Sequence, residues 1–259
     1  MQQTRSRGVR PWYQLSYLLQ VGRRKLNDRH FVRDYSRLVT ALLARHAPDE
    51  AMALAVGGAF ESIGAIEHAL LCHAGLRDGM TLIDFGCGSG RLASVLGRQP
   101  IRLDYCGIDI DQRLLDYAKK QAPPHFRFVL NRELQIPAAD AVADMVCAFS
   151  VFTHLLHAES YLYLEDTRRV LRPGGVLVFS FLEFAQPAHW QVFADTVAAE
   201  RRRAGAHLNQ FIERGVIDLW AEKLGYEKLA YIDADATPWG EPGPLGQSAV
   251  ILRRPLVGA

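Results

Sequence analysis

The sequence predicts an α/β protein built on a mostly parallel sheet, and three observations support this. Short apolar runs alternate with segments whose apolar residues recur at helical spacing. These runs are apolar at nearly every position, as strands buried on both faces of a parallel sheet are. The last two runs are joined by a segment rich in Pro and Gly that has no helical pattern. We therefore expect those two strands to pair antiparallel, because a parallel crossover needs a helix.

The expected elements follow one another in a regular order. Strands are predicted over 81–85, 103–108, 126–130, 143–149, 176–181, 226–233 and 248–252. Helical patterns cover 11–46, 62–74, 92–97, 111–121, 161–171 and 216–224. A helical insertion over about 184–225 interrupts the alternation of strands and helices.

The chain is organised around the stretch 81–91, which reads TLIDFGCGSGR. A short apolar run containing Asp84 passes into a turn with glycines spaced two apart, and a helix-compatible run follows. Glycine lets the backbone turn sharply and approach a ligand with no Cβ in the way. The helix that follows directs its N–H groups toward the same place. The spacing is not the dinucleotide pattern G-x-G-x-x-G, because position 91 is arginine.

Composition excludes several classes of protein. The 259 residues are 49% hydrophobic and 22% charged, with a net charge of +2, which disfavours a strongly electrostatic nucleic-acid binder. No uninterrupted apolar run reaches the roughly 18 residues of a membrane span, and the N-terminal region is not a clean signal-peptide core. The four cysteines form no C-x-x-C pair, so no metal site is expected. Three of them fall in or beside expected buried strands, which indicates a reducing, cytoplasmic location.

Four motifs in order carry a resemblance to a known family. The segment Asp84 to Gly90 is followed by Gly107-Ile108-Asp109, then by Asp144-Met145-Val146, then by LRPGG at 171–175. This series resembles the class I S-adenosylmethionine (SAM)-dependent methyltransferases over residues 75–185. The resemblance implies a Rossmann-like seven-stranded sheet, mostly parallel with the last strand antiparallel, which extends to the C-terminus.

The resemblance also implies two parts of the chain. Residues 75–259 would form the SAM-binding methyltransferase domain, and residues 1–74 an N-terminal helical lid or cap. Trp12, Tyr13 and Tyr17 lie near one another at helical spacing. Such an aromatic stripe is either a core contact or a lid over the sulfonium cation of the cofactor. The basic residues between 23 and 37 are interrupted by acids, so a solvated helix face is the favoured interpretation.

The cofactor implied by the resemblance is SAM. Asp109 would accept hydrogen bonds from both ribose hydroxyls, and Asp84 would order the loop or meet the methionine ammonium through water. Arg91 would pair with the methionine carboxylate or remain a solvated helix-start residue. Asn131 and Arg132 compete for the position that touches the adenine. The full set of expected cofactor contacts is Asp84, Gly86, Cys87, Gly88, Gly90, Arg91, Asp109, Ile110, Asn131, Arg132, Phe149 and Gly57.

Methyl transfer is an in-line displacement, so the protein mainly aligns the acceptor and excludes water. A base is needed only where the acceptor must lose a proton. His154 lies just past the fourth strand and is the candidate base, with a purely structural role as the alternative. Tyr17 and Tyr13 are further catalytic candidates, and His157 and His189 are weaker ones.

We therefore predict a SAM-dependent methyltransferase that acts on a small-molecule metabolite in a biosynthetic reaction. Its acceptor pocket would lie between the lid, residues 150–160 and the insertion. One alternative is an enzyme that uses SAM itself as substrate, through intramolecular cyclisation or aminocarboxypropyl chemistry that releases methylthioadenosine. Others are a non-catalytic SAM-binding protein and an RNA methyltransferase that uses the basic N-terminal helices. No membrane partner is expected, and the sequence leaves the oligomeric state open, a homodimer included.

Overall fold

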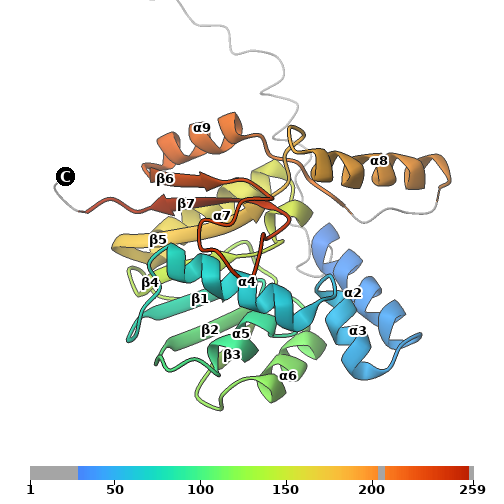
Figure 1. Ribbon diagram of the computed structural model, residues 1–259, viewed down its shortest axis with the longest axis horizontal. Helices are drawn as coiled ribbons and strands as arrows, with labels where there is room; N and C mark the ends of the chain where they lie inside the picture. The colour runs from blue at the N-terminus through green and yellow to red at the C-terminus, as the bar shows by residue number, and fades with distance from the viewer. Residues whose placement is uncertain (1–28, 204–207, 257–259) are drawn as a thin grey trace, which may run out of the picture.

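The computed structural model describes residues 29–203 and 208–256, and all structural statements concern these residues. Seven strands form one sheet in the order β3-β2-β1-β4-β5-β7-β6 (Figure 1). The strands are β1 (Thr81–Phe85), β2 (Asp104–Asp109), β3 (Arg127–Leu130), β4 (Ala143–Ala148), β5 (Leu171–Phe181), β6 (Glu227–Ile232) and β7 (Ser248–Arg253). The pairs from β3 to β5 are parallel, and β7 is antiparallel to both β5 and β6. The expected fold class and the antiparallel pairing of the last two strands are confirmed.

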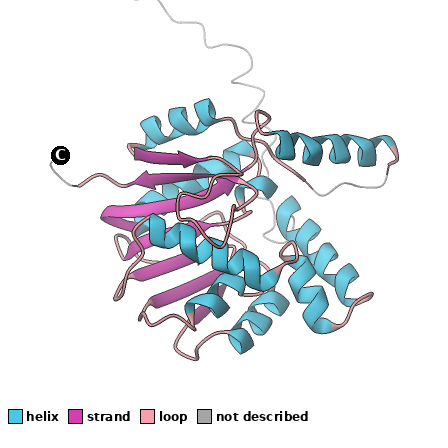
Figure 2. Cartoon of the chain, viewed as in Figure 1, coloured by secondary structure: helices cyan, strands magenta, loops and turns pink. Residues whose placement is uncertain are grey.

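Helices cover both faces of this sheet (Figure 2). They are α2 (His30–Leu43), α3 (Pro48–Ala55), α4 (Phe60–His73), α5 (Arg91–Leu96), α6 (Gln112–Gln121), α7 (His157–Val170), α8 (Pro187–Arg201) and α9 (Arg214–Leu224), with a short 3₁₀ helix at Phe152–His154. The expected helix over 11–46 begins outside the described residues, and α2 is the part of it that the structure describes. Helix α8 projects past the end of the sheet (Figure 1).

Two apolar cores lie on the two faces of the sheet. Alternate residues of β1 supply them: Ile83 packs into one core and Leu82 into the other. This follows from the strand period of two, which sends successive side chains to opposite faces. The first core is closed by α7 and α9, and the second by α4, α5 and the loop before β7. The sheet is therefore buried on both sides, as its continuous apolar runs indicate.

The starts of β5 and α7 lie several residues earlier than the sequence prediction. Strand β5 begins at Leu171, and the register of its pairing with β4 shifts between Ala143 and Met145, so the Pro-Gly-Gly segment is an irregularity within the strand. Helix α7 begins at His157, a turn earlier than expected. The Glu159 carboxylate accepts the backbone N–H of Leu156 at 3.0 Å, which caps the earlier start.

The stretch Pro48–His73 has enough length and mean hydropathy (1.2) to pass a composition test for a membrane span, although the sequence has no uninterrupted apolar run of that size. The structure divides it into α3 and α4 at Gly57 and Gly58, whose φ angles are +89° and +76°. Those angles suit glycine and end the first helix. Helix α4 then contributes Leu70 and Leu71, both fully buried, to the core beneath the sheet.

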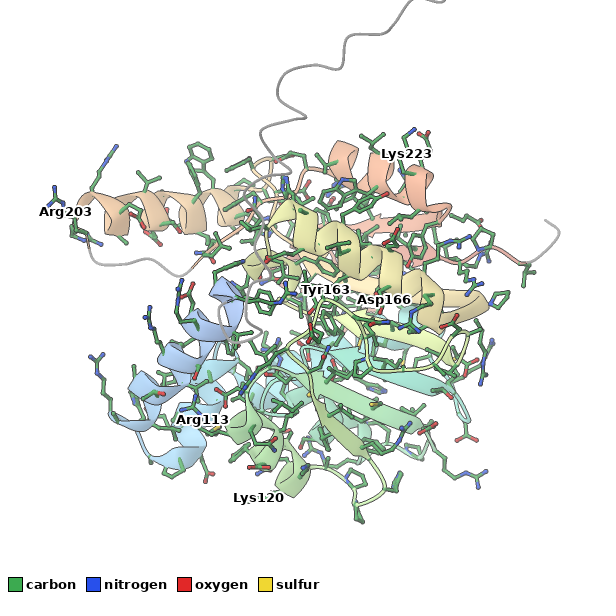
Figure 3. All side chains as sticks on the ribbon, turned by 180° about the vertical axis from the view of Figure 1, so that it is seen from behind. Arg113, Lys120, Tyr163, Asp166, Arg203 and Lys223 are labelled. Carbon is green, nitrogen blue, oxygen red and sulfur yellow. The ribbon has the colours of Figure 1, made fainter. Side chains whose placement is uncertain are left out.

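Helix α2 is held over one edge of the sheet by polar contacts at both ends. Near its start, His30 Nε2 lies 2.8 Å from Glu159 Oε2 of α7. Farther along, Arg113 of α6 donates to Thr40 Oγ1 at 2.8 Å and to the Ser36 carbonyl at 3.0 Å. Figure 3 shows Arg113 between α6 and α2. These contacts fix the helix that forms one wall of the site described next.

Candidate functional site

A cavity of about 360 Å³ opens where the strand order reverses. The chain winds outward from β1 through β2 to β3, then returns to β4 and β5 on the other side of β1. The crevice beyond the carboxyl ends of the strands at such a point is where open α/β sheets bind ligands. Residues of the β1–α5 turn, the end of β2 and the segment after β4 line the cavity, together with residues of α2 and α8.

Two glycines of the β1–α5 turn line the cavity, and neighbouring wall residues leave no space for a side chain at either position. Gly86 and Gly88 have φ angles of +80° and +55°. A Cβ on Gly86 would lie 2.3 Å from Val151 Cγ2, and one on Gly88 would lie 2.4 Å from Val56 Cγ1. Both valines also line the cavity. Any side chain at either glycine would therefore displace a wall of the site.

Gly90 serves a different purpose from the one that its place in the motif implies. It is not among the residues that line the cavity. A Cβ at this position would lie 2.7 Å from the Cβ of Ala118, so Gly90 lets α6 pack closely against the turn. Its φ of +85° also suits the residue that precedes α5.

Asp109 ends β2 with its carboxylate held by backbone amides. Oδ2 accepts Gly88 N–H at 2.9 Å, and Oδ1 accepts Ile110 N–H at 2.7 Å and Asp111 N–H at 3.0 Å. Burial raises the pKa of Asp109 to about 6, and these three hydrogen bonds oppose the rise. A carboxylate has about four lone-pair sites, so capacity remains for a donor in the cavity.

Asp84 lines the same cavity near the carboxyl end of β1. Its side chain is only 3% exposed, and it accepts the Tyr105 hydroxyl at 2.6 Å and the Cys147 thiol at 3.6 Å. Burial raises the pKa of Asp84 to about 7; the Tyr105 hydrogen bond opposes this, and the charge of Glu67 adds to it. The group therefore changes charge near neutral pH in the ligand-free protein.

Arg91 is buried, which excludes its interpretation as a solvated helix-start residue. Its Nε donates to Glu67 Oε1 at 2.8 Å, and its Nη1 donates to the Val56 carbonyl at 2.5 Å. The two side chains of this ion pair are 11% and 2% exposed. Burial raises the pKa of Glu67, and Arg91 lowers it in opposition. Arg91 thus lines the cavity with its guanidinium oriented by an acid from α4.

The other expected cofactor contacts divide into two groups. Those that line the cavity are Gly57, Cys87, Ile110, Asn131 and Phe149. Arg132 is not among the lining residues, and its Nε donates to the Ile110 carbonyl at 3.0 Å. Asn131 donates through Nδ2 to the carbonyls of Glu133 and Gln135, which orders the turn after β3. Of the two residues that compete for the adenine position, Asn131 is the one at the cavity.

His154 lines the cavity at the end of the 3₁₀ helix. Its Nδ1 lies 2.8 Å from the Leu208 carbonyl oxygen. A carbonyl only accepts, so Nδ1 carries the proton, and the lone pair of a neutral ring is on Nε2. The ring centroid lies 6.3 Å from that of Tyr35 on α2.

The weaker histidine candidates lie off the cavity. His157 has Nε2 3.1 Å from the Phe211 carbonyl oxygen. His189 is 1% exposed and bonds the backbone of Glu183 and Gly246, which is a structural role. Tyr13 and Tyr17 lie outside the described residues.

Sequence reasoning missed several residues that line the cavity, among them Tyr35, Glu67, Asn209 and Gln247. The sequence could have indicated Glu67, because this acidic residue interrupts the apolar face of α4. Gln247 and Asn209 lie in segments without regular pattern and reach the cavity only through tertiary packing. In the described part of the chain, no three His, Cys, Asp or Glu side chains gather as metal ligands would.

Comparison with known proteins identifies the family. Residues 83–179 match the methyltransferase domain family. This range holds the β1–α5 turn, Asp109 and β4, which build the cavity. These residues form a class I SAM-dependent methyltransferase domain.

Individual relatives of this chain are distant. A sterol 24-C-methyltransferase of Gibberella zeae is 29% identical over 206 residues, covering 73% of this chain and 52% of the relative. A ubiquinone biosynthesis O-methyltransferase of Nitrobacter winogradskyi is 31% identical over 136 residues, covering 51% and 47%. The chain spans between 30% and 52% of the lengths of three curated relatives, the Gibberella zeae enzyme among them.

A solved structure of magnesium protoporphyrin IX methyltransferase from Synechocystis, with S-adenosylhomocysteine bound, superposes with a TM-score of 0.55. It is 16% identical and covers 75% of this chain and 82% of that one, a likeness of fold.

The cofactor of this family is SAM, and the residues present fit it. A ligand with ribose hydroxyls can donate to the carboxylate of Asp109. A sulfonium and an ammonium group suit a cavity whose wall holds the buried acids Asp84 and Asp109. The methyltransferase domain therefore places two carboxylates, Asp84 and Asp109, where they can bind the ribose and the positively charged groups of SAM.

Proposed function

We propose that this protein transfers a methyl group from SAM to a small-molecule acceptor, as a step in small-molecule biosynthesis. The observation that carries the proposal is the single cavity in which the Asp109 carboxylate and the β1–α5 turn face residues of α2 and α8. The names of the two relatives, a sterol methyltransferase and a ubiquinone biosynthesis methyltransferase, also support a small-molecule acceptor.

The chain's own residues would hold the cofactor by charge and shape. Asp109 accepts one ribose hydroxyl through Oδ2, and Asp84 faces the methionine ammonium through water. Arg91, oriented by Glu67, offers its remaining N–H groups to the methionine carboxylate. When bound, SAM supplies a methyl group already activated by its positive sulfur. Burial in the cavity strengthens these interactions because little water competes for the charges.

His154 is the base in this proposal where the acceptor carries a hydroxyl. The hydrogen bond to Leu208 leaves the lone pair of the neutral ring on Nε2. SAM would give its methyl group to the acceptor oxygen and keep the electron pair of the broken carbon–sulfur bond. His154 Nε2 takes the hydroxyl proton and later passes it to water, so charge and atoms balance.

Residues 1–74 are proposed as a helical lid or cap over this site and 75–259 as the catalytic domain, with the insertion at about 184–225 on the acceptor side. In support, Phe31, Tyr35 and Leu38 of α2 line the cavity, as does Val192 of α8. We also propose a cytoplasmic site of action, because the four cysteines are all free thiols.

The deciding experiment is product analysis by mass spectrometry. Purified protein is incubated with SAM and a panel of small hydroxylated metabolites. The proposal expects S-adenosylhomocysteine and a methylated acceptor in equal amounts. Methylthioadenosine formed without any acceptor would contradict it and favour intramolecular chemistry on SAM. SAM that binds but is not consumed with any acceptor would favour a non-catalytic binding protein.

A further inference from the structure

The cavity has two chemically different halves. One half is built by the β1–α5 turn and by the ends of β2 and β3, where the cofactor contacts gather. The other half is built by α2, the segment after β4, the end of β5, α8 and the loop before β7. Its principal lining residues are Tyr35, Thr153, His154, Leu182, Val192 and Asn209. Because the strand order reverses between β1 and β4, the two halves lie on opposite sides of the switch point.

All formal charge among the described lining residues is confined to the cofactor half. It comes from Glu67, Asp84, Arg91 and Asp109. Arg91 is paired with Glu67, and the two aspartates accept hydrogen bonds from neighbouring groups. The acceptor half holds no Asp, Glu, Lys or Arg in the described chain. The charges of Asp109 and Arg91 act on Tyr35 from the cofactor half, where the proposed cofactor contacts engage them. A buried carboxylate or ammonium on the acceptor would therefore lose its water without a charged partner of its own.

An aromatic surface lies directly outside the acceptor half. It consists of Phe184, Trp190, Phe193 and Phe211, and we call it the α8 aromatic surface. Phe184 stacks on Phe211 with ring centroids 4.4 Å apart, and Phe193 lies 5.2 Å from Phe184. Phe184 and Trp190 remain 42% and 53% exposed. Exposed aromatic clusters of this kind commonly mark a binding site.

The α8 aromatic surface is continuous with the cavity wall. Leu182 lines the cavity two residues before Phe184, and its carbonyl accepts the Ile212 N–H at 2.8 Å. Val192 lines the cavity next to Phe193. Asn209, another lining residue, donates to Thr196 Oγ1 of α8 at 3.0 Å. Leu182, Val192 and Asn209 therefore connect the wall of the acceptor half to the segments that carry the aromatic rings.

We propose that the acceptor is uncharged and carries an apolar tail, with its reactive group beside His154 and its tail on the α8 aromatic surface. This inference rests on the proposed function and names the substrate class of the same site. The occupant of the aromatic surface is the acceptor's tail, because the surface continues the acceptor wall. Arg203, just beyond the far end of α8, lies away from the body of the protein (Figure 3) and takes no part.

Three probes test the charge and the tail separately: 4-ethylphenol, 4-octylphenol and 4-octylbenzoate. Each is titrated calorimetrically, below its micelle concentration, into full-length protein saturated with S-adenosylhomocysteine. 4-Octylphenol should bind at least about tenfold more tightly than 4-ethylphenol, because the longer chain buries more apolar surface. It should also bind at least about tenfold more tightly than 4-octylbenzoate, whose carboxylate meets no cation.

Substitutions in the α8 aromatic surface test whether the apolar tail of the acceptor binds there. Trp190→Ala and Phe184→Ala should each weaken 4-octylphenol binding by about tenfold or more and leave 4-ethylphenol unchanged. Leu219→Ala on α9, which removes a similarly exposed apolar side chain (51%), is the matched control and should change neither. Retained S-adenosylhomocysteine binding shows that each variant is folded.

Three results would overturn the inference: equal binding of the short and long phenols, binding of 4-octylbenzoate as tight as that of 4-octylphenol, or no phenol binding at all. A Trp190→Ala variant that loses a dimer seen by sedimentation, with tail binding intact, would reassign the surface to a second copy. Failure of the proposed function has its own readout, because product analysis with SAM would then give no methylated acceptor with S-adenosylhomocysteine, whatever the phenols bind.

Discussion

Arg91 of α5 and Glu67 of α4 form a buried ion pair at the wall of the cavity, with Arg91 Nε 2.8 Å from Glu67 Oε1. The pair joins a helix outside the matched family range to the turn that holds the cofactor contacts. It orients the guanidinium while leaving part of its donor fork to a ligand. Glu67 is thus a positioning residue for Arg91.

Removing Glu67 should destabilise the protein strongly. Glu67→Ala leaves the buried Arg91 charge uncompensated, and breaking such a pair costs about 3–5 kcal/mol in free energy of unfolding. Urea denaturation measures this value. Glu61→Ala is the control on the same helix, because its pair with Arg98 is exposed at 66% and 54%. That change should cost at most about 1 kcal/mol. Equal costs for the two variants would contradict a structural role of the buried pair.

SAM affinity should depend on pH through Asp84. Burial raises the pKa of Asp84 to about 7 in the ligand-free protein, and a cationic ligand binds the ionised carboxylate better. Affinity should therefore be highest above about pH 7 and fall by up to about tenfold per pH unit below it. Calorimetric titrations across this range measure the slope. Asp84→Asn should bind SAM weakly and with a flatter profile, and an unchanged slope in that variant would assign the titration elsewhere.

Gly88→Ala should abolish SAM binding as well as lower stability. Alanine would have to adopt the backbone φ of +55° found at Gly88, and its Cβ would lie 2.4 Å from Val56 Cγ1. A wall of the cavity must therefore move. Gly79→Ala is the matched control, since its φ is +81° and no atom lies within 4 Å of the new Cβ. The control should lose about 1 kcal/mol from backbone strain alone and keep SAM affinity. Full SAM binding by Gly88→Ala would show that the wall yields easily.

His154→Gln should lower kcat by a factor of about 10²–10⁴ with a neutral hydroxyl acceptor, because the base is lost. SAM affinity should stay unchanged, and the pH–rate profile should lose its acidic limb. His157→Gln serves as the control, because His157 lies outside the cavity lining. A His154 variant that keeps both its rate and its pH profile would give this histidine a structural role only.

The sequence could predict the sheet because its strands are encoded locally. The run at 81–85 and the glycine turn after it give a strand and its ligand loop from consecutive residues. The position of Asp109 could also be predicted from the sequence, because this residue ends a short apolar run. The early start of α7 was not, because it depends on a single capping contact from Glu159.

The acceptor half of the site escaped sequence analysis for a physical reason. Its residues come from separate segments that carry no shared pattern, and tertiary packing alone brings Tyr35, Asn209 and Gln247 together. Gly90 shows the converse, since its place in the motif implies a ligand contact while the structure sets it against Ala118. A motif indicates where the backbone must be glycine but not which neighbour requires it.

The most direct measurement is a calorimetric titration of SAM into the full-length protein and into Asp109→Asn at about pH 8, where both cavity aspartates are ionised. Asp235→Asn, which changes an exposed aspartate, is the control. We expect the wild-type and control proteins to bind one SAM per chain, and Asp109→Asn to bind at least about tenfold more weakly. No binding by the wild-type protein, or equal binding by Asp109→Asn, would contradict the site described here.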